Sequence, residues 1–216
     1  MRKFLLTALL PSAMFFIGGC NLGNWFMHVF APPIPMKTIE AQFGDLPGKT
    51  VAVVVFAGPE IQLDYNMAQL ELTDAVGAEL RRKVRNVTLI DARRVIRYQA
   101  ENVRWDAMPP ENLCDVFGAD YVMLISLMEF STREQGSIHL ARGRITAEIN
   151  IYKAKLSSTG GGNPVWRTGP IYTVYPAESS MGMPAGNDLQ IRILTERIFA
   201  AELVKNFHEY KVPKES

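Results

Sequence analysis

Thr50-Val51-Ala52-Val53-Val54-Val55-Phe56 is the segment that decides the fold of this chain. An unbroken run of apolar and β-branched residues is typical of a strand covered on both faces, so a central strand is predicted here. Gly58-Pro59 ends the run. In the helical pattern that follows, one apolar residue stands at every fourth position: Ala68, Leu72, Val76, Leu80 and Val84. One face of this helix is therefore expected to be buried.

A second, short strand is predicted at Val87-Thr88-Leu89-Ile90. Asp91 is placed to cap a helix that runs to about Asn102. Because a β-α-β connection is almost always right-handed and parallel, the first two strands are expected to pair in parallel. Pro109-Pro110-Glu111 is typical of the start of a small helix, and Gly118 is expected to end it because glycine takes positive φ readily.

The second half of the chain predicts three more strands. Residues 120–130 have apolar side chains at both odd and even positions, and so on both faces of a strand. This pattern indicates a strand inside the sheet. Residues 142–153 alternate instead, which indicates one wet face. The inward positions are Ile145, Ala147, Ile149 and Ile151, and the outward ones are Arg144, Thr146, Glu148 and Asn150. After a turn at 160–163, residues 165–175 complete an antiparallel meander.

A final helix is predicted over 188–210. Its polar positions form one narrow stripe: Asp188, Arg192, Thr195, Glu202, Asn206 and Glu209. The broad remainder carries Ile191, Leu194, Ile198, Ala201, Val204 and Phe207. So wide an apolar surface packs either on the sheet alone or on the sheet and a second surface such as another subunit. The fold class predicted is α/β, with packed helices and a mixed sheet of about five strands that starts parallel and ends as an antiparallel meander.

The first twenty residues predict export and lipid modification. Arg2 and Lys3 precede an uncharged apolar stretch, residues 4–17, which is short for a membrane-spanning helix and typical of a signal peptide. Gly18-Gly19-Cys20 resembles a lipobox, where the thiol receives a diacylglyceryl group and the chain is cut before the cysteine. The alternatives are a plain secretory signal whose cleavage site contains a cysteine, and an uncleaved anchor.

Four segments follow from this interpretation: a signal peptide at 1–19, a lipid-anchored tether at 20–48, a single globular domain at 49–211 and a tail at 212–216. The aromatic residues of the tether lie either at the headgroups or against the folded domain or a partner. Asn21 is not the aspartate that retains some lipoproteins in the inner membrane. An envelope location facing the periplasm is therefore expected, with the outer membrane favoured over the inner.

Composition does not favour nucleic acid as a partner, because 23 basic and 22 acidic residues give a net charge of only +1. Cys114 is the only cysteine besides Cys20, so no intramolecular disulfide is expected, and Cys114 is interpreted as a small buried apolar residue.

Catalytic and metal-binding patterns were sought with little result. His28, His139 and His208 are dispersed without ligand spacing, and no metal site, cofactor or catalytic residue is predicted. The weak alternative is a carboxylate pair formed by Glu129 and Glu148 on adjacent strands, against ordinary solvated or Arg-paired side chains.

Basic residues cluster at the end of the first helix and along the second. The candidate partner-binding residues are Arg81, Arg82, Arg93, Arg94 and Arg97. They form either a solvated surface that complements the dipole of the first helix, or a docking site for anionic lipid headgroups or an acidic partner.

Three segments together resemble a family of bacterial envelope lipoproteins: VAVVVF at 51–56, VTLIDARRVIRYQAEN at 87–102 and LCDVFGADYVMLISLMEF at 113–130. The family includes the curli secretion lipoprotein, the lipoprotein activators of penicillin-binding proteins and the similarly folded amino-terminal domain of the Tol-system β-propeller protein. The resemblance implies an anticodon-binding-domain-like fold that acts as a non-enzymatic docking module. Pore formation is not expected, because a membrane-spanning hairpin needs roughly 9 to 11 residues per strand and the connection at 131–141 is short.

We therefore predict a lipid-anchored, non-enzymatic interaction module that serves an envelope assembly, secretion or cell-wall machine. Its expected partners are the membrane, through Cys20, and envelope proteins of unknown identity. One alternative is a homo-oligomeric subunit of an outer-membrane export or transport complex, in which the final helix or the strand at 165–175 pairs with neighbours. Another is an envelope enzyme or small-ligand binder.

Overall fold

The computed structural model describes residues 35–137, 139–155, 162–177, 182–184, 186 and 188–213. The chain divides into two compact units, one of Met1–Thr38 with Lys211–Ser216 and the other of Ile39–Tyr210. Strands β1 (Met36–Ile39) and β8 (Tyr210–Pro213) form a two-stranded sheet. The predicted signal peptide and Cys20 lie outside the described residues. Within those residues, no helix combines the length and apolarity that crossing a membrane requires.

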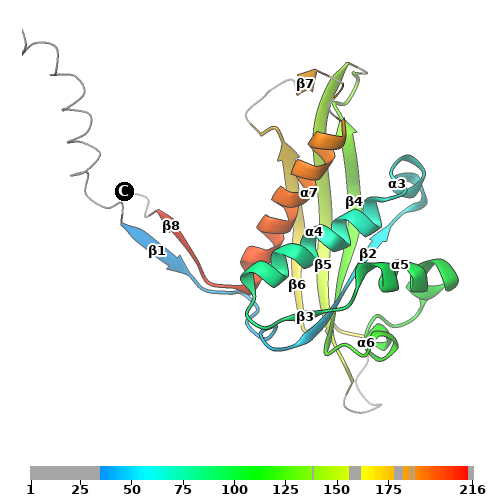
Figure 1. Ribbon diagram of the computed structural model, residues 1–216, viewed down its shortest axis with the longest axis vertical. Helices are drawn as coiled ribbons and strands as arrows, with labels where there is room; N and C mark the ends of the chain where they lie inside the picture. Colours follow the sequence, from blue (N-terminus) through cyan, green and yellow to red (C-terminus); the bar gives the residue numbers. More distant parts are fainter. Residues whose placement is uncertain are drawn as a thin grey trace, which may run out of the picture. The chain divides into compact units, whose positions relative to one another are not determined.

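The larger unit is built on a six-stranded mixed sheet in the order β3-β2-β4-β5-β6, with β7 paired to β5 (Figure 1). Its strands are β2 (Thr50–Ala57), β3 (Thr88–Leu89), β4 (Tyr121–Arg133), β5 (Leu140–Lys153), β6 (Trp166–Tyr175) and β7 (Met183–Pro184). β2 pairs in parallel with β3 and β4, whereas β4, β5 and β6 are antiparallel. The predicted α/β class, the central strand and the mixed sheet are confirmed.

The helices of this unit are α3 (Pro59–Asp64), α4 (Ala68–Lys83), α5 (Ala92–Glu101), α6 (Asn112–Phe117) and α7 (Asp188–Val204), with short 3-10 turns at Trp105–Ala107 and Lys205–Phe207. Two predicted helix ends are confirmed. The Asp91 side chain accepts a hydrogen bond from the Arg93 backbone N–H at 2.7 Å, and Gly118 ends α6 with φ of 66°.

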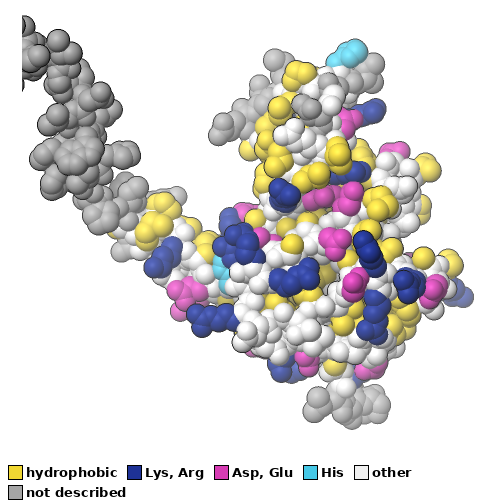
Figure 2. Space-filling model, in the orientation of Figure 1, with side chains coloured by type: hydrophobic (Ala, Val, Ile, Leu, Met, Phe, Trp, Pro, Cys, Tyr) yellow, Lys and Arg dark blue, Asp and Glu magenta, His cyan; other side chains and the backbone are white. Residues whose placement is uncertain are grey.

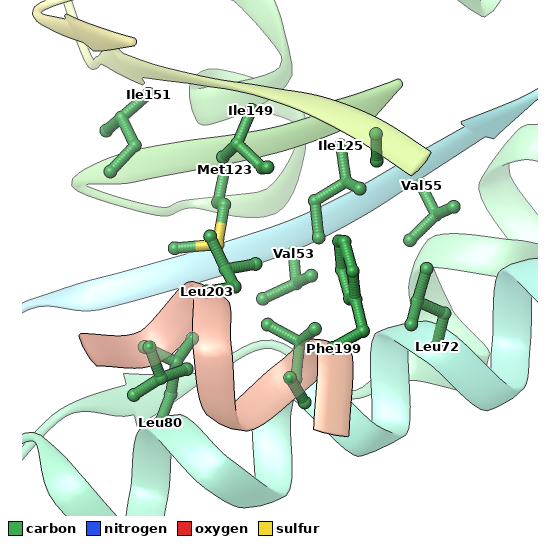
Figure 3. Close-up of a cluster of buried hydrophobic side chains, with 14 of the residues drawn as sticks. Val53, Val55, Leu72, Leu80, Met123, Ile125, Ile149, Ile151, Phe199 and Leu203 are labelled. Atoms are coloured by element: carbon green, nitrogen blue, oxygen red, sulfur yellow. The ribbon is translucent and has the colours of Figure 1, made fainter. Parts of the chain in front are cut away.

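Helices α4 and α7 cover one face of the sheet and form the main core with it (Figure 3). The labelled core residues are Val53 and Val55 of β2, Met123 and Ile125 of β4, Ile149 and Ile151 of β5, Leu72 and Leu80 of α4, and Phe199 and Leu203 of α7. Burying each such side chain contributes roughly 1.5–3 kcal/mol relative to exposure. Phe43 and Leu46, which fall in the segment expected to be a tether, are buried in this core as well.

The opposite face of the sheet is only partly covered. A smaller apolar cluster joins α5 and α6 to β2 and β4, with Val54, Val95, Leu113, Cys114, Phe117 and Val122 among its members. Cys114 is buried there, as predicted, and burial raises the pKa of its thiol to about 11. Along β5, Glu148 on this face is exposed, and so is Tyr172 of β6, which is paired with Thr146. The predicted wet face of β5 is confirmed.

Helix α7 differs from the prediction in two respects. It ends at Val204, so Tyr210 belongs to strand β8 and not to the helix. Its buried stripe also includes Thr195, which was expected to face water, while Ile198 remains 40 % exposed. Thr195 is tolerated in the core because its hydroxyl donates a hydrogen bond to the Ile191 carbonyl at 2.6 Å.

Candidate functional site

A groove lies between α4 and α7, which are side by side on the sheet (Figure 1). Its volume is about 620 Å³. The middle of this α4–α7 groove is lined by small side chains from both helices: Ala75, Ala78, Ala200 and Ala201. Because alanine leaves the backbones accessible, the groove has room for the close approach of another chain.

Larger residues line the rest of the groove. They are Glu71, Asp74, Glu79 and Arg82 from α4, and Ile193, Glu196 and Arg197 from α7. Of these, Ile193 is apolar and 37 % exposed, and α7 also carries the exposed apolar residues Leu189 and Ile198. Figure 2 shows hydrophobic side chains interspersed with charged ones over this helical layer. The groove therefore offers apolar surface at Ile193 and space beside its alanines for another protein to pack.

One of the groups that line the groove is a buried carboxyl group. Glu196 is only 4 % exposed, and its carboxyl group lies close to that of Glu71. Burial, followed by the negative charge of Glu71, raises the pKa of Glu196 to about 8, although Arg192 opposes the shift. We call Glu71 and Glu196 the carboxyl pair.

Arg192 forms an ion pair with only one member of the carboxyl pair, Glu71. Its Nη2 lies 3.1 Å from Oε1 of Glu71. Oε2 of Glu71 and Oε1 of Glu196 have no N–H or O–H donor among the described residues. A proton shared by the two carboxyl groups satisfies both oxygens, so Glu196 is protonated near neutral pH.

No pattern in the sequence predicts this pair as a site. Glu196 stands three residues before Phe199 and seven before Leu203, and it is therefore on the buried stripe of α7. That spacing was the only available signal, since Glu71 lies in a helix far away in the chain.

The predicted arginines are all on the surface, but they are not gathered at one point. Arg81 and Arg93 line a hollow of about 210 Å³ together with Asp74 and Asp91. Arg82 instead donates to Glu79 at 2.8 Å, and the Arg94 guanidinium lies 6.0 Å from the ring centre of Phe117. Arg97 is on the same helix as Arg93 and Arg94. Partner binding by these residues stays a prediction.

The carboxylate pair considered on adjacent strands is not formed across the sheet. Glu129 is opposite Thr146, whose hydroxyl donates to it at 3.1 Å, whereas Glu148 is opposite Ser126. A register shift between Leu127 and Glu129 accounts for the offset. No cluster of His, Cys, Asp and Glu suited to a metal ion occurs in the part of the chain that the structure describes.

These features define an α/β protein with a mixed sheet and a grooved helical layer on one face. No protein-family model matches the chain, and neither does any curated protein. Several solved structures are similar to the chain, among them three bacterial proteins of which two are called lipoproteins.

The lipoprotein GNA1162 from Neisseria meningitidis is 18 % identical, with a TM-score of 0.43, over 61 % of this chain and 85 % of that one. The PelC dodecamer from Paraburkholderia phytofirmans is 11 % identical, with a TM-score of 0.45, over 81 % of this chain and 98 % of that one. The minor lipoprotein from Acinetobacter baumannii is 13 % identical, with a TM-score of 0.31, over 73 % of this chain and 87 % of that one. At these values, function has to be inferred from the residues of the chain itself.

Proposed function

We propose that this protein is a lipid-anchored, non-enzymatic interaction module of the bacterial cell envelope. It docks on a protein of an assembly, secretion or cell-wall machine, the kind of system served by the family that the sequence resembles. The observation that carries the proposal is the α4–α7 groove, where the exposed Ile193 stands beside a floor of small side chains. The lipobox-like Gly18-Gly19-Cys20 supports the anchor.

Docking in this groove follows a known pattern of recognition. An amphipathic helix places its apolar face in a groove and anchors itself through a few side chains. A tethered module meets partners on the same membrane at high effective concentration, so modest affinity is enough for function. The proposed role therefore needs no catalytic residue.

Replacing Ile193 with Asp is expected to lower the recovery of cross-linked envelope partners about tenfold, because a charge is then introduced beside the docked apolar surface. The measurement is quantitative mass spectrometry after cross-linking in cells and affinity purification. Tyr172→Ser is the matched control, since Tyr172 is 62 % exposed and lies on β6, away from the groove.

The same experiment compares the groove with the arginine surface. The double variant Arg93→Glu and Arg94→Glu reverses two exposed charges on α5. If it removes the partners while Ile193→Asp retains them, docking occurs at the arginines and not in the groove. If both variants retain every partner, the interaction role of this layer is wrong.

Replacing Cys20 with Ser is expected to leave the protein without acyl chains and to move it from the membrane fraction to the soluble periplasmic fraction. The reason is that two or three acyl chains anchor a protein stably, and the substitution removes the thiol whose modification supplies that anchor. Cell fractionation and the intact mass of the purified protein check this. A wild-type mass that still includes residues 1–19 and no lipid would contradict the anchor.

The alternative role is a subunit of an oligomeric export or transport complex. Helix α7 supports it, since Leu189 and Ile198 remain 59 % and 40 % exposed. The edge strand β6 supports it less, because Pro170 has no backbone N–H to offer a neighbouring strand. A discrete ring in mild detergent would favour this alternative over the docking module.

A further inference from the structure

We propose that the α4–α7 groove binds an amphipathic helix of a partner protein that carries a lysine or arginine, and that this basic side chain binds the carboxyl groups of Glu71 and Glu196. The inference rests on the proposed function, because it names the chemistry of the partner that docks in the same groove.

The charges that line the groove favour a cationic occupant. Four of the lining residues are acidic, namely Glu71, Asp74, Glu79 and Glu196, and two are basic, namely Arg82 and Arg197. Arg82 is already bound to Glu79, and Arg192, which lies next to the groove, is bound to Glu71. The carboxyl group of Glu196 and the exposed Asp74 therefore remain for the cation of a partner, and the exposed Arg197 is the lining cation that no acidic residue pairs within the described residues.

The carboxyl pair has two buried oxygens that are satisfied only by a proton taken up from solvent. Oε2 of Glu71 and Oε1 of Glu196 are both buried and have no donor within the described residues. An ammonium or guanidinium group carries several N–H donors and serves both oxygens at once. A shared proton stabilises the pair less than a cation does, because it leaves one of the two carboxyl groups neutral and neutral groups form weaker hydrogen bonds than charged ones.

The shape of the groove favours a helix with one long basic side chain. The alanines of both helices permit close approach, and helices that pack in this way lie about 8–10 Å apart. The stem of a lysine or arginine lies along apolar surface while its charged end reaches polar groups. Ile193 provides such apolar surface beside the carboxyl pair.

Proton exchange gives the inference a specific signature. Glu196 has a pKa of about 8, so it holds its proton at pH 7, and a cation that binds beside it lowers that pKa. The groups that face it are Glu71 from α4 and Arg192 from α7, with Asp74, Glu79, Arg82 and Arg197 along the groove. Binding of a basic side chain is therefore expected to release close to one proton at pH 7.

The test uses two synthetic helical peptides with the same stripe of Leu and Ala, one with a central lysine and the other with norleucine in its place. Each is titrated by calorimetry at pH 7 into the full mature chain carrying Cys20→Ser, in phosphate and in Tris buffer. The lysine peptide is expected to bind at least about tenfold more tightly than the norleucine peptide. Its binding is also expected to release close to one proton, which is detected as a binding enthalpy that differs between the two buffers.

Glu196→Gln is expected to remove both the preference for lysine and the proton release, because its amide keeps the shape of the protonated carboxyl group but does not ionise. Glu202→Gln is the matched control, since Glu202 is exposed on the same helix and pairs with Lys205. A preference for lysine that survives Glu196→Gln would overturn the inference, and so would equal affinity for both peptides. If neither peptide binds while Ile193→Asp still removes the cross-linked partners, recognition of a basic side chain is wrong and the docking function stands.

Discussion

Replacing Glu196 with Gln is expected to raise the free energy of unfolding by about 3 kcal/mol at pH 7. The wild-type chain takes up a proton when it folds, because the pKa of Glu196 rises from 4.5 to about 8. Taking up that proton at pH 7 costs about 1.4 kcal/mol for each pH unit above the unfolded pKa. Glutamine has no such cost, and its amide can still donate a hydrogen bond to Glu71. The midpoint of thermal unfolding should rise by about 6–12 °C.

The pH dependence of this effect has a definite sign. Between pH 4.5 and about 8 the folded state binds one proton more than the unfolded state at Glu196. The contribution of the protonated side chain is therefore complete below pH 4.5 and is lost as pH rises through about 8. Glu196→Gln should exceed the wild type by less than about 1 kcal/mol at pH 5 and exceed it most at pH 8 and above.

Urea unfolding of the two proteins between pH 5 and pH 9 checks this expectation. Glu202→Gln is again the control, since it removes an exposed carboxyl group from the same helix. Two pH profiles that run parallel for the wild type and Glu196→Gln would show that Glu196 is ionised in the folded state.

The sequence was sufficient for elements whose signals are local. The apolar run at Thr50–Phe56, the alternation at Arg144–Asn150 and the caps at Asp91 and Gly118 each depend on neighbouring residues, and each prediction is confirmed. The early end of α7 was not predictable in this way, because Tyr210 pairs in a sheet with a strand from the other end of the chain. Pairing between distant segments leaves little trace in a local pattern.

The candidate site was harder to predict than the fold. The arginines are recognisable as a charged cluster in the sequence, but the groove is lined by residues of two helices that are more than a hundred residues apart. Glu196 reads as a surface residue because glutamate is almost never fully buried without a partner. Its partner, Glu71, is supplied by tertiary packing alone.

Replacing Gly143 with Ala is expected to lower the free energy of unfolding by about 3 kcal/mol. Gly143 is buried on β5 directly under α7. A Cβ atom at this position would overlap the Thr195 hydroxyl and lie 2.8 Å from the Thr195 Cβ. Helix α7 then has to move away from the sheet, which loosens the packing of Phe199 and Leu203 in the main core.

Gly169→Ala in the neighbouring strand β6 provides the control, because nothing lies within 4 Å of a Cβ added there. That change should alter stability by less than about 1 kcal/mol. Adding Thr195→Ala to Gly143→Ala removes the hydroxyl and the methyl group that meet the new Cβ, so part of the stability should return. Equal unfolding midpoints in urea for the two alanine variants would contradict close contact between α7 and β5. If the contact is as described, the displaced helix also separates Glu196 from Glu71, so Gly143→Ala should flatten the pH dependence of stability as Glu196→Gln does.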